Sequence, residues 1–480
     1  MLFNSFSFVI FLLIVFALYW SSPQKFRWII LLISSYYFYM SWNAKYIVLI
    51  LGTTFVSYSA GFILEKTRRK KAVLIVASVI CLGILVIFKY LNFILSGFYD
   101  LCRMIAIPCN PVWVKLTLPV GISFYTFQTL SYVIDVYRGD IKAERHFGYY
   151  AAFISFFPQL VAGPIERTKD LLPQIKADHK FEYRTAIDGV KLMLWGYYKK
   201  IVVADTLAVY VDKVYANPIE YTGFTLLLAT VFFAIQIYCD FSGYSDIAVG
   251  TAELMGIRLM KNFNSPYFSK SLKEFWRRWH ISLSSWFRDY VYIPMGGSHC
   301  GTFRHNFNLF FTFLLSGVWH GSSLTYIAWG MWHGLGQILE GYLLKVLQDI
   351  KKSRIYNFMS WLFVFFFCVL SWVLFRSESI SEAVYIYKNM FSEILHIKLY
   401  LENGFHELKM LGIGTKRVIY LSFIIMLLSV IDYISYKGNV IEFLKNKRPV
   451  LNWIIYIVLA VIIVLFSQKG VTTEFVYFQF

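Results

Sequence analysis

Residues 72–88 read AVLIVASVICLGILVIF, an apolar run without a single charged side chain. An α-helix rises about 1.5 Å per residue, so roughly 20 apolar residues cross the hydrocarbon core of a bilayer. Similar runs recur along the chain, in which 58% of the 480 residues are hydrophobic and only 15% are charged. A soluble domain cannot hide that much apolar surface. The sequence therefore predicts an all-α, polytopic membrane protein with about 11–12 transmembrane helices.

The apolar runs predict where the chain crosses the membrane. They lie near residues 3–20, 27–42, 46–63, 72–91, 147–163, 222–239, 306–320, 324–345, 356–375, 417–436 and 450–467. Residues 117–137 are apolar but interrupted by a proline, a glycine and an aspartate, which predicts a broken or re-entrant helix inside the protein. Residues 183–215 carry lysines and an aspartate among apolar residues, which favours a helix at the membrane interface.

Basic residues indicate how the chain is oriented. Cytoplasmic loops of membrane proteins carry an excess of Lys and Arg close to the spans. Residues 25–27 and 66–71 are basic and follow the first and third spans, and the basic residues 437–448 precede the last span. We therefore predict a multi-pass protein of the inner (cytoplasmic) membrane with both termini on the outer side. Membrane lipid headgroups then account for the net charge of +18, and no nucleic-acid partner is expected.

Ionisable groups at membrane depth are costly, so each is a functional candidate. The first cluster of such groups follows the apolar run 222–239 and reads DFSGYSD from Asp240 to Asp246. A hydrogen-bond network that joins helices and a direct part in catalysis are both compatible with it.

A second cluster, residues 273–290, reads KEFWRRWHISLSSWFRDY. On one continuous helix, Trp276, Trp279 and His280 share a face because they are spaced by three and four residues. The arginines of the stretch lie off that face. They fit either an amphipathic interfacial helix or a phosphate site, since planar guanidinium groups bind phosphate bidentately. These arginines are Arg277, Arg278 and Arg288.

A third cluster, residues 316–321, reads SGVWHG and places His320 at the end of an apolar run. A histidine in desolvated surroundings keeps a basic nitrogen available at neutral pH. It can then take a proton from a hydroxyl that attacks a carbonyl group. A structural hydrogen-bonding role fits a membrane histidine equally well, so the residue types leave both roles open.

These motifs resemble the membrane-bound O-acyltransferase family, and within it the alginate O-acetyltransferase branch, which is related to the teichoic-acid D-alanyl transfer protein. The matching motifs lie at 118–125, 157–165, 240–246, 276–294 and 317–321. The resemblance covers residues 1–380 and implies a funnel-like catalytic core. Residues 381–449 then form a variable segment with a further span, and residues 450–480 a final outward span with a tail.

The resemblance implies the transfer of an acyl group, most simply acetyl, from a cytoplasmic thioester to an extracytoplasmic polysaccharide or cell-wall polymer. It makes His320 the catalytic histidine and His280 the second motif histidine, on the cytoplasmic approach. Donor contacts are then expected from Arg277, Arg278, Trp279, Arg288, Asp289, Trp319, Asp240 and Asp246. The donor is coenzyme A or an acyl carrier protein, and D-alanyl remains an alternative acyl group. No bound cofactor is expected, and the six cysteines form no CxxC pair that would indicate a metal site.

The chain ends with FVYFQF at residues 475–480. Such a segment fits an aromatic anchor at the membrane interface. It also resembles the C-terminal motif of the small single-span partner in the D-alanylation system. That resemblance implies that Tyr477 carries the acyl group and passes it to a secreted or periplasmic esterase-like transferase. A glycan transporter or flippase is the alternative from another class, with His320 and the aspartates as a proton path.

Overall fold

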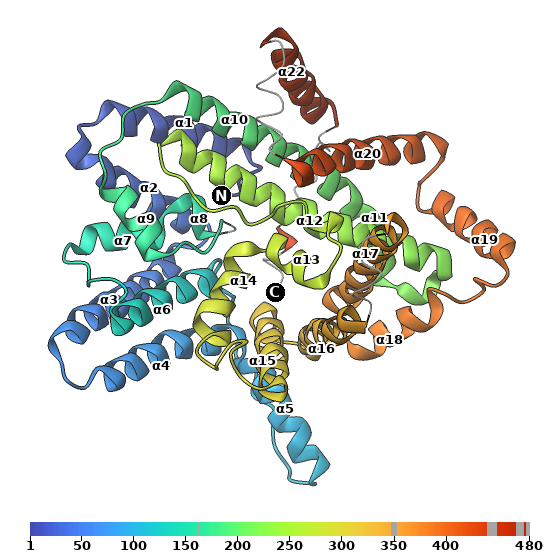
Figure 1. Ribbon diagram of the computed structural model, residues 1–480, viewed down its shortest axis with the longest axis horizontal. Helices are drawn as coiled ribbons and strands as arrows, with labels where there is room; N and C mark the ends of the chain where they lie inside the picture. Colours follow the sequence, from blue (N-terminus) through green and yellow to red (C-terminus); the bar gives the residue numbers. More distant parts are fainter. Residues whose placement is uncertain (162, 347–352, 439–448, 467–474, 477–480) are drawn as a thin grey trace. The chain divides into compact units, whose positions relative to one another are not determined.

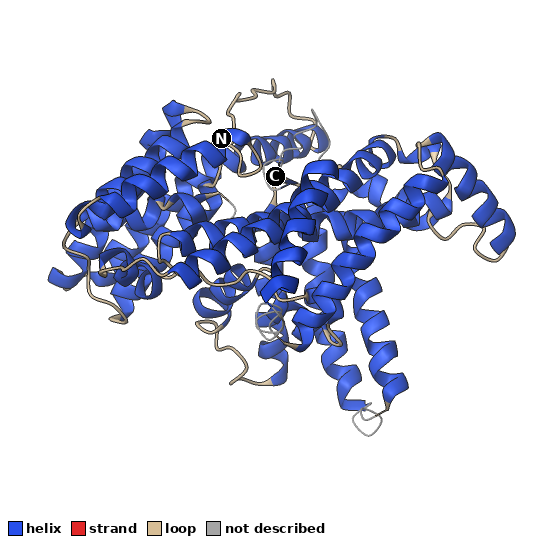
Figure 2. Cartoon of the chain, turned by 90° about the horizontal axis from the view of Figure 1, so that it is seen from above, coloured by secondary structure: helices blue, strands red, loops and turns tan. Residues whose placement is uncertain are grey.

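The computed structural model describes residues 1–480 except 162, 347–352, 439–448, 467–474 and 477–480. The described chain is built from helices joined by loops and turns, as Figure 2 shows, and it contains no strand in these residues. The predicted all-α class is therefore confirmed. The chain divides into two compact units. The N-terminal unit comprises residues 1–193 and 247–260, and the C-terminal unit comprises residues 194–246 and 261–480.

Several described helices are long and apolar enough to cross a bilayer. They are Ala44–Lys66, Lys70–Lys89, Gly223–Leu254, Arg354–Arg376 and Thr415–Lys437, and two shorter apolar helices cover Phe6–Ser21 and Trp453–Phe466. In the most apolar 18 residues of Lys70–Lys89, 17% of the residues are buried inside the protein. In the corresponding stretch of Gly223–Leu254, 72% are buried. The polytopic membrane fold is confirmed, and Gly223–Leu254 is the helix most enclosed by protein among these five.

The N-terminal unit is arranged around helix α6, Ile122–Arg138, whose side chains are almost all buried. Helices α3 and α4 pack against it. The other helices are α1 (Phe6–Ser21), α2 (Arg27–Met40), α3 (Ile47–Lys66), α4 (Lys70–Lys89), α5 (Leu91–Met104), α7 (Phe147–Ser155), α8 (Phe157–Leu160), α9 (Thr168–Lys176) and most of α10 (Tyr183–Tyr197). Helix α6 begins after Gly121, which has φ 74°. A Cβ at Gly121 would lie 2.4 Å from the Leu160 carbonyl oxygen. The predicted interruption of residues 117–137 is thus a glycine-dependent start of a buried helix.

The span predicted at residues 147–163 is wrong. The chain forms the nine-residue helix α7 and the four-residue helix α8 there, and neither is long enough to cross a bilayer. Phe156 separates them with ψ 107°, just ahead of Pro158, which has no N–H to continue a helix. The Phe157 N–H that the break releases donates to Ser35 Oγ at 3.0 Å. Apolar composition alone did not reveal this break.

The C-terminal unit holds the remaining helices, which Figure 1 shows from green to red. They are α11 (Asp205–Ala216), α12 (Gly223–Leu254, up to Asp246), α13 (Leu272–Arg278), α14 (Ile281–Phe287), α15 (Thr302–His320), α16 (Leu324–Val346), α17 (Arg354–Arg376), α18 (Ile380–Asn389), α19 (Ile397–Met410), α20 (Thr415–Lys437) and α22 (Pro449–Phe466). Helices α15 and α16 pack along each other because Gly317 and Gly330 face one another at their contact. A Cβ on Gly317 would lie 2.3 Å from the Tyr326 carbonyl oxygen. This close pairing fixes the end of α15, where His320 lies.

Candidate active site

His320 is the last residue of α15 and lies in an aromatic enclosure, with 3% of its surface exposed. The rings of Trp319 and Trp329 each lie 5.0 Å from the imidazole, and the Phe375 ring lies 5.3 Å from it. All three meet the imidazole steeply, at interplanar angles of 72–86°. The enclosure shields the imidazole from solvent.

His280 lies at a break between two helices and not on one continuous helix. Its backbone is left-handed, with φ 41° and ψ 56°, between the end of α13 at Arg278 and the start of α14 at Ile281. The Ile281 N–H donates to the Asn262 carbonyl at 2.9 Å instead of to the preceding turn. The shared helical face predicted for Trp276, Trp279 and His280 is therefore wrong, because Asn262 captures the backbone at the break.

The break costs free energy and so needs support from its surroundings. A left-handed conformation costs a residue other than glycine about 1–3 kcal/mol. Ser282 Oγ donates to Asn262 Oδ1 at 2.6 Å, which reinforces the backbone bond at the same position. Strained backbone of this kind is frequent at functional sites. At this break the His280 ring lies against the Phe241 ring, with the ring centroids 4.6 Å apart and an interplanar angle of 86°. Burial lowers the pKa of His280 to about 3, so the imidazole is neutral at pH 7.

Trp319 connects the two histidines. Its ring lies 6.1 Å from the His280 ring and 5.0 Å from the His320 ring. The structure thus brings together His280, Trp319 and His320, three residues that the sequence singled out in two separate motifs.

His333 is built into the packing between helices. Its Nδ1 accepts from Trp276 Nε1 at 3.3 Å, and its Nε2 lies 3.0 Å from Ser371 Oγ. Both ring nitrogens are therefore engaged by neighbouring side chains, and the residue is completely buried. These contacts fit a structural histidine that joins α13, α16 and α17.

The sequence-predicted arginines occupy three different environments. Arg278 donates to Glu274 at 3.0 Å and to the Asn264 carbonyl at 3.0 Å. Arg288 donates to its neighbour Asp289 at 2.7 Å, and Arg277 is exposed on α13. The same motif contains Trp279, which is buried and stacked on Phe275 at 5.5 Å. Trp279 thus contributes to the core of the C-terminal unit.

Two buried lysines pair with the predicted aspartates. The π-helical turn Tyr198–Ala204 holds Lys199 and Lys200 inside the protein. Lys199 lies 2.5 Å from Asp246 Oδ2, and Lys200 lies 2.6 Å from Asp240 Oδ1 and 2.8 Å from Asp205 Oδ1. Burial on its own would lower the pKa of Lys200, but the attraction of Asp240 and Asp205 outweighs it and raises that pKa. The ammonium therefore stays charged.

These ion pairs were not predicted from the sequence. Residues 183–215 were expected at the membrane interface, where lysines need no partner. The available signal was the pair Lys199–Lys200 close to Asp205 in otherwise apolar sequence, because buried charges require opposite charges. For the DFSGYSD motif we considered a network that joins helices and a part in catalysis. The ion pairs of Asp240 and Asp246 join α12 to this π-helical turn, which agrees with the first of these.

The C-terminal tail reaches the same cluster. Tyr477 lies outside the described residues, whereas Phe475 and Val476, which precede it, are both buried. The Phe475 ring lies 4.6 Å from Tyr244 and 5.7 Å from Phe241. The Val476 N–H donates to Asp240 Oδ2 at 2.7 Å. Phe475 and Val476 therefore pack on the same face of α12 that contacts His280 through Phe241.

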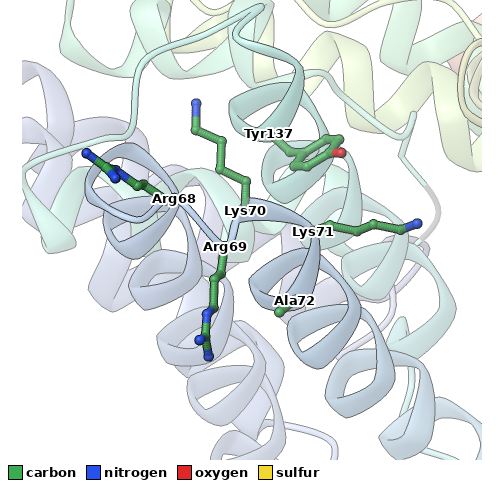
Figure 3. Close-up of a pocket in the computed structure, with 6 residues that line it drawn as sticks. All are labelled: Arg68, Arg69, Lys70, Lys71, Ala72 and Tyr137. Atoms are coloured by element: carbon green, nitrogen blue, oxygen red, sulfur yellow. The ribbon is translucent and has the colours of Figure 1, made fainter.

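An open hollow of about 610 Å³ lies elsewhere, in the N-terminal unit. It is lined by Arg68, Arg69, Lys70, Lys71, Ala72 and Tyr137. Figure 3 shows that the four cationic side chains point away from one another, so they do not form a convergent phosphate site. They match the basic loop expected after the third span. Among the described residues, no group of three His, Cys, Asp or Glu side chains could hold a metal ion.

Comparison with known proteins agrees with these motifs. Residues 143–380 match the model of MBOAT, the membrane-bound O-acyltransferase family. The chain is 42% identical over 403 residues to "Probable alginate O-acetylase AlgI" of Pseudomonas aeruginosa, covering 82% of this chain and 75% of that protein. It is 32% identical over 401 residues to the peptidoglycan O-acetyltransferase of Helicobacter pylori, covering 75% and 73%. It is 33% identical over 226 residues to the teichoic acid D-alanyltransferase of Bacillus subtilis, covering 43% and 55%.

Proposed function

Because the chain belongs to the membrane-bound O-acyltransferase family, we propose that it moves an acetyl group from a cytoplasmic thioester to an extracytoplasmic polymer by way of Tyr477. The chain is a multi-pass membrane O-acyltransferase. One observation carries the proposal of a tyrosine intermediate. A series of ring contacts runs from Phe475, two residues before Tyr477 in the sequence, through Phe241 to His280, and then through Trp319 to His320.

The proposed first step forms an ester on the tyrosine. His320 takes the proton of the Tyr477 hydroxyl while the phenol oxygen attacks the thioester carbonyl. The C–S bond breaks, and the leaving thiolate receives the proton from the His320 imidazolium. General acid–base assistance of this kind accelerates a reaction about 10²–10⁴-fold. The neutral His280 and the ring of Trp319 complete the apolar surroundings of the reacting groups.

The proposed second step occurs outside the cell. A secreted or periplasmic esterase-like transferase takes the acetyl group from Tyr477 and delivers it to a polymer hydroxyl, which regenerates the phenol. Phenol has a pKa near 10, so its ester is more activated than an alkyl ester. The predicted outward direction of the final span supports this step, because it carries Tyr477 to the side where no thioester donor exists.

The acyl group and the donor are assigned from different observations. Acetyl is favoured by how much of this chain aligns with each kind of relative. The alignments with the O-acetylating relatives cover 82% and 75% of the chain, whereas the alignment with the D-alanyltransferase of Bacillus subtilis covers 43%. The donor's phosphates are assigned to the arginines of the second motif. Arg277 and Arg288 are exposed, and Arg288 also donates to Asp289, whereas Arg278 is bonded to Glu274. Of the other residues predicted to contact the donor, Asp240 and Asp246 are paired with Lys200 and Lys199, so we assign them to the support of α12. Trp279 and Trp319 are buried among aromatic rings.

Mass spectrometry tests the tyrosine relay. The full-length protein in lipid nanodiscs is incubated with isotope-labelled acetyl-coenzyme A and digested. We expect a labelled acetyl group on Tyr477 in the wild type, and none in Tyr477→Phe or in folded His320→Ala. Tyr183→Phe is the matched control, because Tyr183 is 65% exposed on the N-terminal unit.

Two outcomes contradict the proposal. Normal acetylation of the polymer by Tyr477→Phe would leave only the membrane-anchor role for the tail. Movement of a glycan across the bilayer without any covalent change would favour a transporter or flippase.

A further inference from the structure

Asp240 divides its two carboxylate oxygens between two partners. Oδ1 lies 2.6 Å from the Lys200 ammonium, and Oδ2 accepts the Val476 N–H at 2.7 Å. The Asp240 side chain is 1% exposed, so water does not compete for either bond. A hydrogen bond to an ionised carboxylate is about twice as strong as one between neutral groups. The tail is therefore held through its main chain by a buried charge.

The Asp240 carboxylate is also held by Lys200. Lys200 joins Asp240 and Asp205, which come from different helices. The approach of α12 to the π-helical turn depends on Gly243, where a Cβ would lie 2.8 Å from the Gly196 carbonyl oxygen and 3.0 Å from the Lys200 backbone nitrogen. Glycine at this position allows the ammonium to reach Asp240. The Asp240 carboxylate is thus also held by contacts that do not involve Val476.

The residue before Val476 is recognised by its side chain. Phe475 is 0% exposed, and its ring packs on the rings of Tyr244 and Phe241. The segment is therefore bound both by a side chain, the buried Phe475 ring, and by a main-chain hydrogen bond from Val476. The main-chain hydrogen bond contributes affinity, and the packing of the Phe475 ring contributes selectivity for an aromatic residue.

We propose that Asp240 is a positioning residue, and that with Tyr244 and Phe241 it forms a docking site for the aromatic C-terminal segment that presents Tyr477 for acylation. This inference rests on the proposed function. Tyr477 follows Val476 directly in the sequence. Consecutive Cα atoms are about 3.8 Å apart, so the bond to Val476 acts one residue away from the proposed nucleophile. Displacement of a reacting group by about 1 Å can reduce a rate by about 10²-fold. The docking site therefore acts on the rate of ester formation and not on binding of the donor.

The test changes the acceptor and the donor of the hydrogen bond between Asp240 and Val476 in separate variants of the full-length protein. Asp240→Asn keeps the shape of the acceptor but removes its charge. Val476→Pro removes the N–H donor and leaves the Lys200–Asp240 pair intact, so it remains informative if Asp240→Asn fails to fold. Asp212→Asn is the matched control, because Asp212 is 58% exposed and pairs with Arg376 on the surface.

Two measurements are made on each variant. Hydrogen–deuterium exchange follows the amides of residues 475–480, and single-turnover kinetics follow acetylation of Tyr477 over a range of donor concentrations. We expect faster exchange of the tail and about 10–100-fold slower acetylation in Asp240→Asn and Val476→Pro, with the same half-saturating donor concentration. Asp212→Asn is expected to behave like the wild type. Val476→Ala keeps the N–H and is expected to retain the protected tail.

The outcomes separate this inference from the proposed function. Wild-type exchange of the tail in both Asp240→Asn and Val476→Pro, or wild-type acetylation of Tyr477 in them, would overturn the positioning role while the relay stands. Loss of tail protection in these variants, with no acetyl on Tyr477 even in the wild type, would support the docking site and overturn the relay.

Discussion

Replacing Lys200 with methionine removes the cation that Asp205 and Asp240 share while it keeps a long unbranched side chain. The ammonium lies 2.8 Å from Asp205 and 2.6 Å from Asp240, and all three side chains are at most 5% exposed. Loss of one member of a buried charge group typically destabilises a protein by about 3–5 kcal/mol, because the remaining charges stay desolvated. We expect a loss of this size for Lys200→Met.

A matched control separates burial from charge. Arg376→Met breaks the ion pair with Asp212, whose atoms lie 3.0 Å apart but whose side chains are 22% and 58% exposed. An exposed pair contributes about 0–1 kcal/mol, since solvent screens it. Both substitutions remove one positive charge from the C-terminal unit. The structure predicts that only the buried one is costly.

Thermal unfolding of the full-length protein in detergent measures both losses. A change of 1 kcal/mol shifts the Tm by about 2–4 °C in a domain of this size. Lys200→Met is therefore expected to lower the Tm by about 6–20 °C, and Arg376→Met by less than about 4 °C. Adding Asp205→Asn and Asp240→Asn to Lys200→Met is expected to restore part of the loss, because the residual negative charges are then gone. Equal Tm values for Lys200→Met and Arg376→Met would refute this account of the cluster.

Two further predictions concern pH and helix packing. The pKa of His280 is lowered to about 3 by burial, so between pH 3 and 6.5 the unfolded chain binds a proton that the folded chain does not. The free energy of unfolding should therefore fall as the pH drops below about 6.5. Denaturation midpoints measured over this pH range should depend less on pH in His280→Gln than in the wild type. His299→Gln is the control at an exposed histidine and should keep the pH dependence of the wild type. Gly317→Ala places a Cβ 2.3 Å from the Tyr326 carbonyl oxygen, whereas Gly341→Ala meets nothing within 4 Å. We expect Gly317→Ala to destabilise the protein by about 1–3 kcal/mol and Gly341→Ala not to, and equal Tm values would contradict the close packing of α15 on α16.

The class of the protein and several of its site residues could be predicted from sequence because their signals are local. Apolar composition reveals helices such as Lys70–Lys89, and motif letters single out His280, Trp319 and His320. The same local signals failed at residues 147–163, where an apolar run is broken ahead of Pro158. They failed again at His280, where a continuous helix was expected. In both cases a distant residue, Ser35 or Asn262, captures a backbone N–H and stabilises the break.

The sequence by itself determined that this chain is a helical membrane protein, because the free energy of placing residues in lipid depends mainly on composition. Its motifs also determined the family and the candidate site residues. Only the tertiary structure decided which charges meet and where the tail binds. Lys200 pairs with Asp240, forty positions away, and Val476 bonds to Asp240 across 236 positions. Such partners are selected by packing, as at Gly243, where the absence of a side chain lets α12 approach the π-helical turn closely enough for the ammonium to reach the carboxylate.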